Sequence, residues 1–320
     1  MDPLTHGIIG LGISTLSGEP AGINPITIGA VLGAMSPDID IVMKYWGDYK
    51  YLKHHRGPTH SIMSLLGMSL IITTGLFFIF NDYSFFRIFL WTFLGSASHT
   101  FFDGLNSYGV RPFMPFTKRK YLANVLMLYD PILTVLSLTL VFLPVTRELK
   151  AIIAVATVAI YILLRLIARD RVYRFLSKRY SLNILTDTVH VLPDLVNFFK
   201  WDFIIKAENY KVVGKINFLN NKFNVIKHLE HTNHKLIKEA NATELGLYFN
   251  EFASSIIHTQ VTEEDDKTVL RLIDLRYFLN DEFMHNATIE FDKDEDKFVK
   301  SVFHPYKLDK EILVEKDKCD

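Results

Sequence analysis

Residues 61–80, SIMSLLGMSLIITTGLFFIF, form an apolar run without a charged side chain. About 20 such residues in a helix match the thickness of the hydrocarbon core of a bilayer. Three further apolar runs follow, at 85–102, 125–143 and 151–168. The sequence therefore predicts a mainly α membrane bundle with four transmembrane helices, in preference to six core helices of a soluble bundle.

Two earlier apolar segments, 7–16 and 26–36, are rich in glycine and too short to cross a bilayer on their own. We expect them to form short helices packed inside the bundle or re-entrant segments. The N-terminus, MDPLTHGIIG, lacks the basic region of a signal peptide, so we expect it to stay in the protein.

The character of the chain changes after residue 168. Of the 320 residues, 49% are hydrophobic, but from 169 onward charged residues are dense. We expect a basic connector at 171–200. Beyond it, LNNK (219–222) between two strand-like runs and an acidic turn at 292–296 are typical of hairpins. The sequence predicts a C-terminal α+β, β-rich soluble domain over 201–308 and a disordered charged tail over 309–320.

Histidines and aspartates gather at one end of the predicted bundle. If the apolar segments alternate in direction, five polar motifs fall on the same membrane side. The turns expected on the other side, at 17–24, 81–84 and 144–150, contain no histidine. The five motifs are Asp2–His6, SPDID (36–40), HHRGPTH (54–60), HTFFDGLNSYG (99–109) and LYDP (128–131).

These residue types indicate a metal site. His99 and Asp103 lie four positions apart, hence on one face of a helix. Asp2 and His6 share that spacing, although Asp2 before Pro3 also suits a helix N-cap. Nitrogen and oxygen donors suit zinc, manganese or iron, and the single cysteine excludes a thiolate cluster within one chain. A site with several carboxylates can hold two or three ions, and the six candidate ligands are His6, Asp38, Asp40, His60, His99 and Asp103.

Lysines and arginines are more frequent in the loops on the motif side than in the opposite loops. The positive-inside rule then places the motifs and the C-terminal domain in the cytoplasm. Basic residues that bind an anionic substrate would give the same bias.

Four motifs together resemble a known family: MDPLTHGIIG, GAMSPDID, HHRGPTHSI and HTFFDGLNSYGVRPFMPF. They look like those of the membrane-bound, metal-dependent hydrolases of bacterial and archaeal inner membranes, over roughly residues 1–170. That family is distantly similar to zinc-dependent phospholipase C and P1 nuclease. The ligand order of those enzymes would be met by His6, Asp38 or Asp40, His60, and then His99 with Asp103. Their later histidine and glutamate ligands have no clear counterpart here, so the resemblance implies one or two divalent ions, zinc before manganese or iron, rather than three.

The resemblance implies hydrolysis of a phosphoester by a metal-activated water in the bacterial cytoplasmic membrane. We assign catalytic roles to Asp40, His55 and Arg56, with either Asp38 or Asp40 as general base. His54 and His55 are open as outer residues, substrate contacts or ligands. Asp130 is either a ligand or a group behind the ligands, or it is the residue that begins a helix before Pro131. The substrate-binding candidates are His54, Arg56, Asn106, Arg111 and Lys118, although the basic ones equally suit lipid headgroups or topology.

Two classes of function remain open at this point. The first is a membrane metallohydrolase that acts on a phosphorylated lipid or similar amphiphile. The second is a non-enzymatic regulator whose structural metal site presents the C-terminal domain to an unidentified partner. A transporter fits less well, because the expected ligands cluster at one membrane face rather than at its middle. No nucleic-acid partner is expected.

Overall fold

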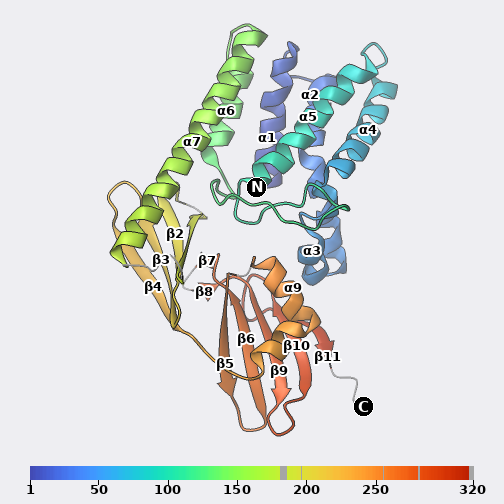
Figure 1. Ribbon diagram of the computed structural model, residues 1–320. Helices are drawn as coiled ribbons and strands as arrows, with labels where there is room; N and C mark the ends of the chain where they lie inside the picture. The colour runs from blue at the N-terminus through green and yellow to red at the C-terminus, as the bar shows by residue number, and fades with distance from the viewer. Residues whose placement is uncertain (181–185, 196, 255, 280–281, 317–320) are drawn as a thin grey trace. The chain divides into compact units, whose positions relative to one another are not determined.

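The computed structural model describes residues 1–180, 186–195, 197–254, 256–279 and 282–316. The chain divides into two compact units (Figure 1). The first, which is helical, comprises Met1–Trp46, His54–Asp170 and Pro193–Phe198. The second comprises Gly47–Lys53, Arg171–Leu192 and Phe199–Asp320.

Prolines and polar caps set where the helices of the first unit begin. Asp2, Asn24 and Asp130 each cap a helix whose first turn contains a proline, and their side chains accept an amide hydrogen bond from that turn. The helices are α1 (Pro3–Ser14), α2 (Pro25–Met35), α4 (Ile62–Ile79), α5 (Phe85–Gly104), α6 (Pro131–Phe142) and α7 (Arg147–Arg179). Short 3₁₀ turns are η1 (Thr15–Ser17) and η3 (Pro58–His60), and a longer 3₁₀ segment, η2, runs over Ser36–Trp46.

The closest packing in this unit is between α2 and α5, which lie side by side in Figure 1. A Cβ added at Gly33 would lie 2.1 Å from the carbonyl oxygen of Thr92, and one added at Gly95 would lie 2.2 Å from that of Ala30. Only glycine permits such an approach of two backbones. One apolar cluster, Ile26, Leu76 and Ile88, joins α2, α4 and α5.

Within the described residues three helical segments are long and apolar enough to cross a membrane, rather than the four expected. They are Pro25–Trp46, Ile62–Ile79 and Arg147–Arg179. The run at 125–143 yields only α6, because Asp130 and Pro131 start the helix late, and 12 residues span about 18 Å. The run at 85–102 forms the 20-residue α5, but its polar residues keep it outside this group.

The segment 26–36 is extended by η2, and the combined path Pro25–Trp46 has the length and apolar character of a membrane span, which 26–36 does not have on its own. Pro37 has no amide hydrogen to donate to the carbonyl of Gly33. That carbonyl instead accepts hydrogen bonds from the backbone amide of Ser36 and from the hydroxyls of Ser36 and Ser96, the two hydroxyls each at 2.9 Å. The chain therefore proceeds through Pro37 without an unsatisfied carbonyl.

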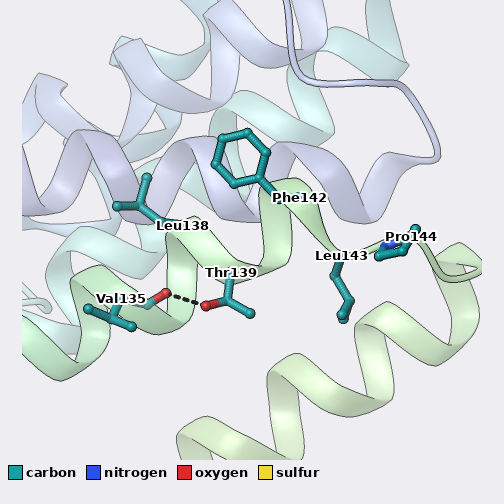
Figure 2. Close-up of a pocket in the computed structure, with 6 residues that line it drawn as sticks. All are labelled: Val135, Leu138, Thr139, Phe142, Leu143 and Pro144. Carbon is teal, nitrogen blue, oxygen red and sulfur yellow. Dashed lines mark hydrogen bonds between the residues drawn. The ribbon is translucent and has the colours of Figure 1, made fainter.

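An apolar hollow lies along α6 and its end, shown in Figure 2. The one hydroxyl in its lining, on Thr139, donates to the carbonyl of Val135 at 2.8 Å, so it offers no free donor to the hollow. The lining suits hydrocarbon and contains no candidate ligand. It consists of Val135, Leu138, Thr139, Phe142, Leu143 and Pro144.

The second unit contains two main sheets. The first has the order β1-β2-β3-β4, from Thr188–Pro193, Lys200–Lys206, Tyr210–Asn217 and Phe223–Glu230. The second has the order β11-β10-β9-β6-β5, from Ile312–Lys316, Phe298–His304, Asn286–Asp292, Lys267–Asp274 and Ile257–Glu263. Phe278–Leu279 (β7) pairs with Glu282–Phe283 (β8). The helices are α3 (Asp48–His54), α8 (Ile237–Ala242) and α9 (Glu244–Phe252).

The β-rich C-terminal domain and both expected hairpins are confirmed, since β3 pairs with β4 and β9 with β10. Two boundaries differ from expectation. The connector expected at 171–200 contains the end of α7 and strand β1. The tail is not disordered at Ile312–Lys316, because β11 pairs there with β10 and places Ile312 opposite the buried Phe303. Residues 317–320 of that tail lie outside the described part of the chain.

Candidate metal centre

Four separate parts of the helical unit bring the six predicted ligands together. His6 lies on α1, Asp38 and Asp40 on η2, His60 on η3, and His99 with Asp103 on the last turns of α5. All six are buried, and His6, His60, His99 and Asp103 have no exposed surface. Buried carboxylates are costly unless a cation or hydrogen-bond donors compensate them. Their roles as ligands remain a prediction.

Atoms that carry lone pairs converge between η2, η3 and α5. The Nε2 atoms of His60 and His99 are 3.1 Å apart. Asp38 Oδ1 lies 3.6 Å from the first and 3.5 Å from the second. Asp103 Oδ2 lies 3.7 Å from each.

The hydrogen bonds of the two rings show which nitrogen is the donor. His99 Nδ1 lies 2.6 Å from the carbonyl oxygen of Ala34, so Nδ1 is protonated and a neutral ring has its lone pair on Nε2. Burial lowers the pKa of His60 well below its usual range, so this ring is neutral. Its Nδ1 lies 3.0 Å from the hydroxyl of Thr59. When that Nδ1 donates to Thr59, the lone pair of His60 lies on Nε2, as it does in His99. Two nitrogen lone pairs and the carboxylates of Asp38 and Asp103 then face one point, an arrangement that a bound cation would satisfy.

A second group of donors adjoins the first on the side of α1. His6, His99 and Asp103 offer three ligand atoms within 4.8 Å of one another. The rings of His6 and His99 stack with centroids 3.6 Å apart and planes inclined by 18°. His6 Nε2 lies 3.3 Å from Asp103 Oδ1, and its Nδ1 has no hydrogen bond within the described residues. The α-amino group of Met1 also contacts the Asp103 carboxylate.

A third group, Asp38, Asp40 and His55, lies on the other side. His55 Nδ1 is 3.0 Å from each carboxylate oxygen of Asp40. The same carboxylate accepts from the backbone amide of Arg56 and from the hydroxyl of Thr59, both at 3.2 Å. Asp40 therefore fixes the HHRGPTH segment as well as adjoining the central group of candidate ligands. The central group shares His99 with the group at α1 and Asp38 with the group at His55, so one or two ions would fit the donor set.

Arg56 and Asn106, expected to bind substrate, are held inside the site. Arg56 Nε lies 3.0 Å from Asp103 Oδ2, and its Nη1 donates to Asn106 Oδ1 at 2.8 Å. Asn106 in turn donates to Asp103 Oδ1 at 3.0 Å. The guanidinium also lies over the ring of Tyr108, 5.0 Å from its centre. Arg56 thus compensates the charge of a candidate ligand and orients it.

Other predicted site residues are not brought into this cluster. Asp130 caps α6 and accepts a hydrogen bond of 2.6 Å from Tyr161, so it is the helix-entry residue that the sequence left as one alternative. His54 and Lys118 are exposed, and Arg111 is half-buried in the loop after α5. Sequence reasoning missed Thr59 and the carbonyl of Ala34, since a lone threonine and a main-chain oxygen give no distinctive pattern.

The N-terminal part of the chain matches a known protein family. Residues 1–172 match the family described as YdjM inner membrane protein. The chain belongs to the YdjM family. This YdjM region contains every candidate ligand and, apart from the end of α7, all three candidate spans. The match supports the conclusion that the protein is associated with a membrane.

The C-terminal part of this YdjM-family chain has its own match. Residues 235–312 match the YfhP C-terminal alpha/beta plait domain. The Bacillus subtilis (strain 168) protein named "Uncharacterized protein YfhP" is 29% identical over 225 residues, which are 67% of this chain and 68% of that protein. No solved structure matches. These comparisons do not support the expected distant likeness to phospholipase C and P1 nuclease.

Proposed function

We propose that this YdjM-family protein is a membrane-embedded, metal-dependent hydrolase that cleaves a phosphoester of a lipid or amphiphile. The observation that carries the proposal is the convergence of His60 Nε2, His99 Nε2, Asp38 Oδ1 and Asp103 Oδ2 on one point. Imidazole and carboxylate donors suit zinc, with manganese or iron as alternatives. A bound ion of this kind would polarise a phosphoryl oxygen and make water acidic near neutral pH.

The Asp40–His55 pair supplies a proton acceptor for such a reaction. Donation from His55 Nδ1 to Asp40 leaves the lone pair of a neutral ring on Nε2. The His55 side chain is 18% exposed, whereas the donors of the central cluster are closed off. We assign proton acceptance to His55 Nε2, and to Asp40 the role of holding that ring and its tautomer.

Exposed apolar and aromatic side chains at this end of the bundle support an amphiphilic substrate. Along η2 the buried Asp38 and Asp40 alternate with the exposed Ile39 and Ile41, and Tyr45 and Trp46 follow. Tyrosine and tryptophan gather where a bilayer meets water. The loop after α5 adds further exposed residues of this kind and several cations: Phe113, Phe116, Tyr129, Lys118 and Arg119. A metal centre at this level would meet phosphorylated headgroups.

A purely structural metal site is the second candidate, and one observation favours it. His6, His60, His99 and Asp103 have no exposed surface, as in closed sites that keep no position for water. Metal analysis of protein purified in detergent, paired with hydrolysis assays on phosphomonoesters, phosphodiesters and phospholipids, separates the two. Bound metal without turnover on any of these substrates supports the structural role.

We expect Asp40→Asn to keep its metal and to lower turnover by about 100-fold, the scale of a lost general base. An amide at this position cannot stabilise the protonated His55 ring as a carboxylate does, whereas the four central donors stay in place. Metal content by mass spectrometry and initial rates check this. Asp130→Asn is the matched control, because Asp130 caps α6 and belongs to none of the three donor groups, and its rate should stay near the wild-type value. Loss of metal from Asp40→Asn would instead make Asp40 a ligand.

We also propose that the metal centre and the C-terminal domain face the cytoplasm. Arg165 and Arg169 of α7 donate to the carbonyls of Val125 and Ala123, so α7 leaves the helical unit at the end that carries the cluster. The loops at that end are rich in lysine and arginine, as the positive-inside rule requires. Cys319, the single cysteine, reports the side directly. A membrane-impermeant maleimide should label it only after the cells are opened, and labelling of intact cells would reverse the assignment.

A further inference from the structure

Helix α3 separates two parts of the metal centre along the chain. Asp40 precedes it, and His55 and Arg56 follow its last residue, His54. By its contacts, however, Gly47–Lys53 belongs to the second unit, and the chain rejoins the helical unit at His54. The C-terminal domain therefore holds a piece of chain that leads directly into the HHRGPTH motif.

Aromatic contacts, hydrogen bonds and ion pairs attach α3 to the rest of the second unit. The Tyr49 ring forms T-shaped contacts with the rings of Tyr248 on α9 and Phe303 on β10, with centroids 5.1 Å and 5.9 Å apart. At the first turn of α9, Glu244 accepts from the hydroxyl of Tyr49 at 3.2 Å and from Lys53 Nζ at 2.7 Å. Asp48 pairs with Lys310. These contacts cover both ends of a seven-residue helix.

The backbone beyond α3 needs such support. Arg56 has a φ of +60°, in the left-handed region that non-glycine residues rarely adopt. Two hydrogen bonds flank it: its amide donates to Asp40 Oδ2 at 3.2 Å, and the amide of Gly57 donates to the carbonyl of His54 at 3.1 Å. The end of α3 is thus one of the two anchors for the conformation that points Arg56 at Asp103.

We propose that the C-terminal domain positions His55 and Arg56 through α3, with Tyr49, Lys53 and Glu244 as positioning residues. The inference rests on the proposed function, because the residues that it positions belong to that site. Release of α3 from α9 would loosen the anchor at His54, and the Asp40–His55 and Arg56–Asp103 contacts would loosen with it. A change in the C-terminal domain would thereby reach the metal centre along the chain.

The test compares hydrogen–deuterium exchange of purified full-length variants in detergent, followed by mass spectrometry. In Glu244→Lys, repulsion of Lys53 should speed exchange about fivefold in the peptides that cover residues 48–53 and 54–60, the scale of one exposed ion pair. The double variant Lys53→Glu/Glu244→Lys restores opposite charges and should return most of the protection. Glu239→Lys is the control, because Glu239 is an exposed first-turn glutamate of the neighbouring α8.

Each outcome has a defined meaning. Faster exchange at 54–60 in Glu244→Lys, with rescue in the double variant, supports positioning through α3. Faster exchange at 48–53 alone, equal effects of Glu239→Lys, or unchanged exchange in every variant overturns it. The readout needs neither metal nor turnover, so failure of the hydrolase proposal leaves this result interpretable. Where wild-type turnover is found, Glu244→Lys should lower it and the double variant should restore it.

Discussion

His99→Ala should lower the zinc affinity of the purified protein by more than about 100-fold, since loss of even an outer partner of a ligand costs about 10- to 100-fold. His99 takes part in two of the three donor groups, more than His6, His55 or His60 does. Its removal therefore weakens two of the three positions that an ion could occupy. Competition with a chromophoric chelator, followed by metal analysis after dialysis, measures the change. Any phosphoesterase activity should disappear with the metal.

The control for this variant is His231→Ala, which removes an exposed histidine of the second unit. It should bind zinc as the wild-type protein does. Equal zinc affinity of His99→Ala and wild type would show that the converging lone pairs do not hold the ion. Loss of zinc from both variants would point instead to adventitious binding by surface histidines.

The second large effect concerns the contact of α2 with α5. Gly95→Ala should destabilise the helical unit by about 3 kcal/mol or more, the upper range for overpacking a close contact. The added carbon would lie 2.2 Å from a backbone oxygen, which cannot move aside as a flexible side chain can. His99 is one helical turn further along α5 and bonds to the Ala34 carbonyl of α2, so zinc affinity should fall as well.

Gly75→Ala is the matched control, because a Cβ added at Gly75 on α4 has no neighbour within 4 Å. It should leave the midpoint of thermal unfolding in detergent unchanged or slightly raised, since alanine is the better helix former. Near-ultraviolet circular dichroism follows the transition in both variants. Equal midpoints for Gly95→Ala and Gly75→Ala would mean that α2 and α5 are not in such close contact.

The sequence predicted best where a single local rule decides the structure. The charge-free run at 61–80 became α4 at Ile62–Ile79, and LNNK joined two strands. The grouping of the His and Asp motifs at one end also followed from simple alternation of segments. Prediction from the sequence failed where the structure depends on partners that are distant in the chain. The hydroxyl of Ser96 supports the path through Pro37 by donating to the carbonyl of Gly33, 63 positions earlier in the chain, and β11 pairs with β10.

The same limit applies to the site. Arg56 looked like a residue that faces substrate, because nothing in HHRGPTH shows that Asp103 will lie 3.0 Å from its Nε. Asp130 offered more than one role, and nothing in its own stretch of sequence shows that Tyr161 on α7 will donate to the carboxylate that caps α6. Helix α3 is short and polar, with no periodicity that would assign it to the C-terminal domain.

The spread of the donors over the chain has a consequence for biosynthesis. Because α1, η2, η3 and α5 each contribute, a nascent chain has no complete donor set until Asp103 has left the ribosome. An ion that arrives before then would meet only part of its ligands and be released readily. If the cluster binds metal as proposed, loading of the ion should therefore follow the synthesis of α5, and a chain that is arrested before α5 should carry none.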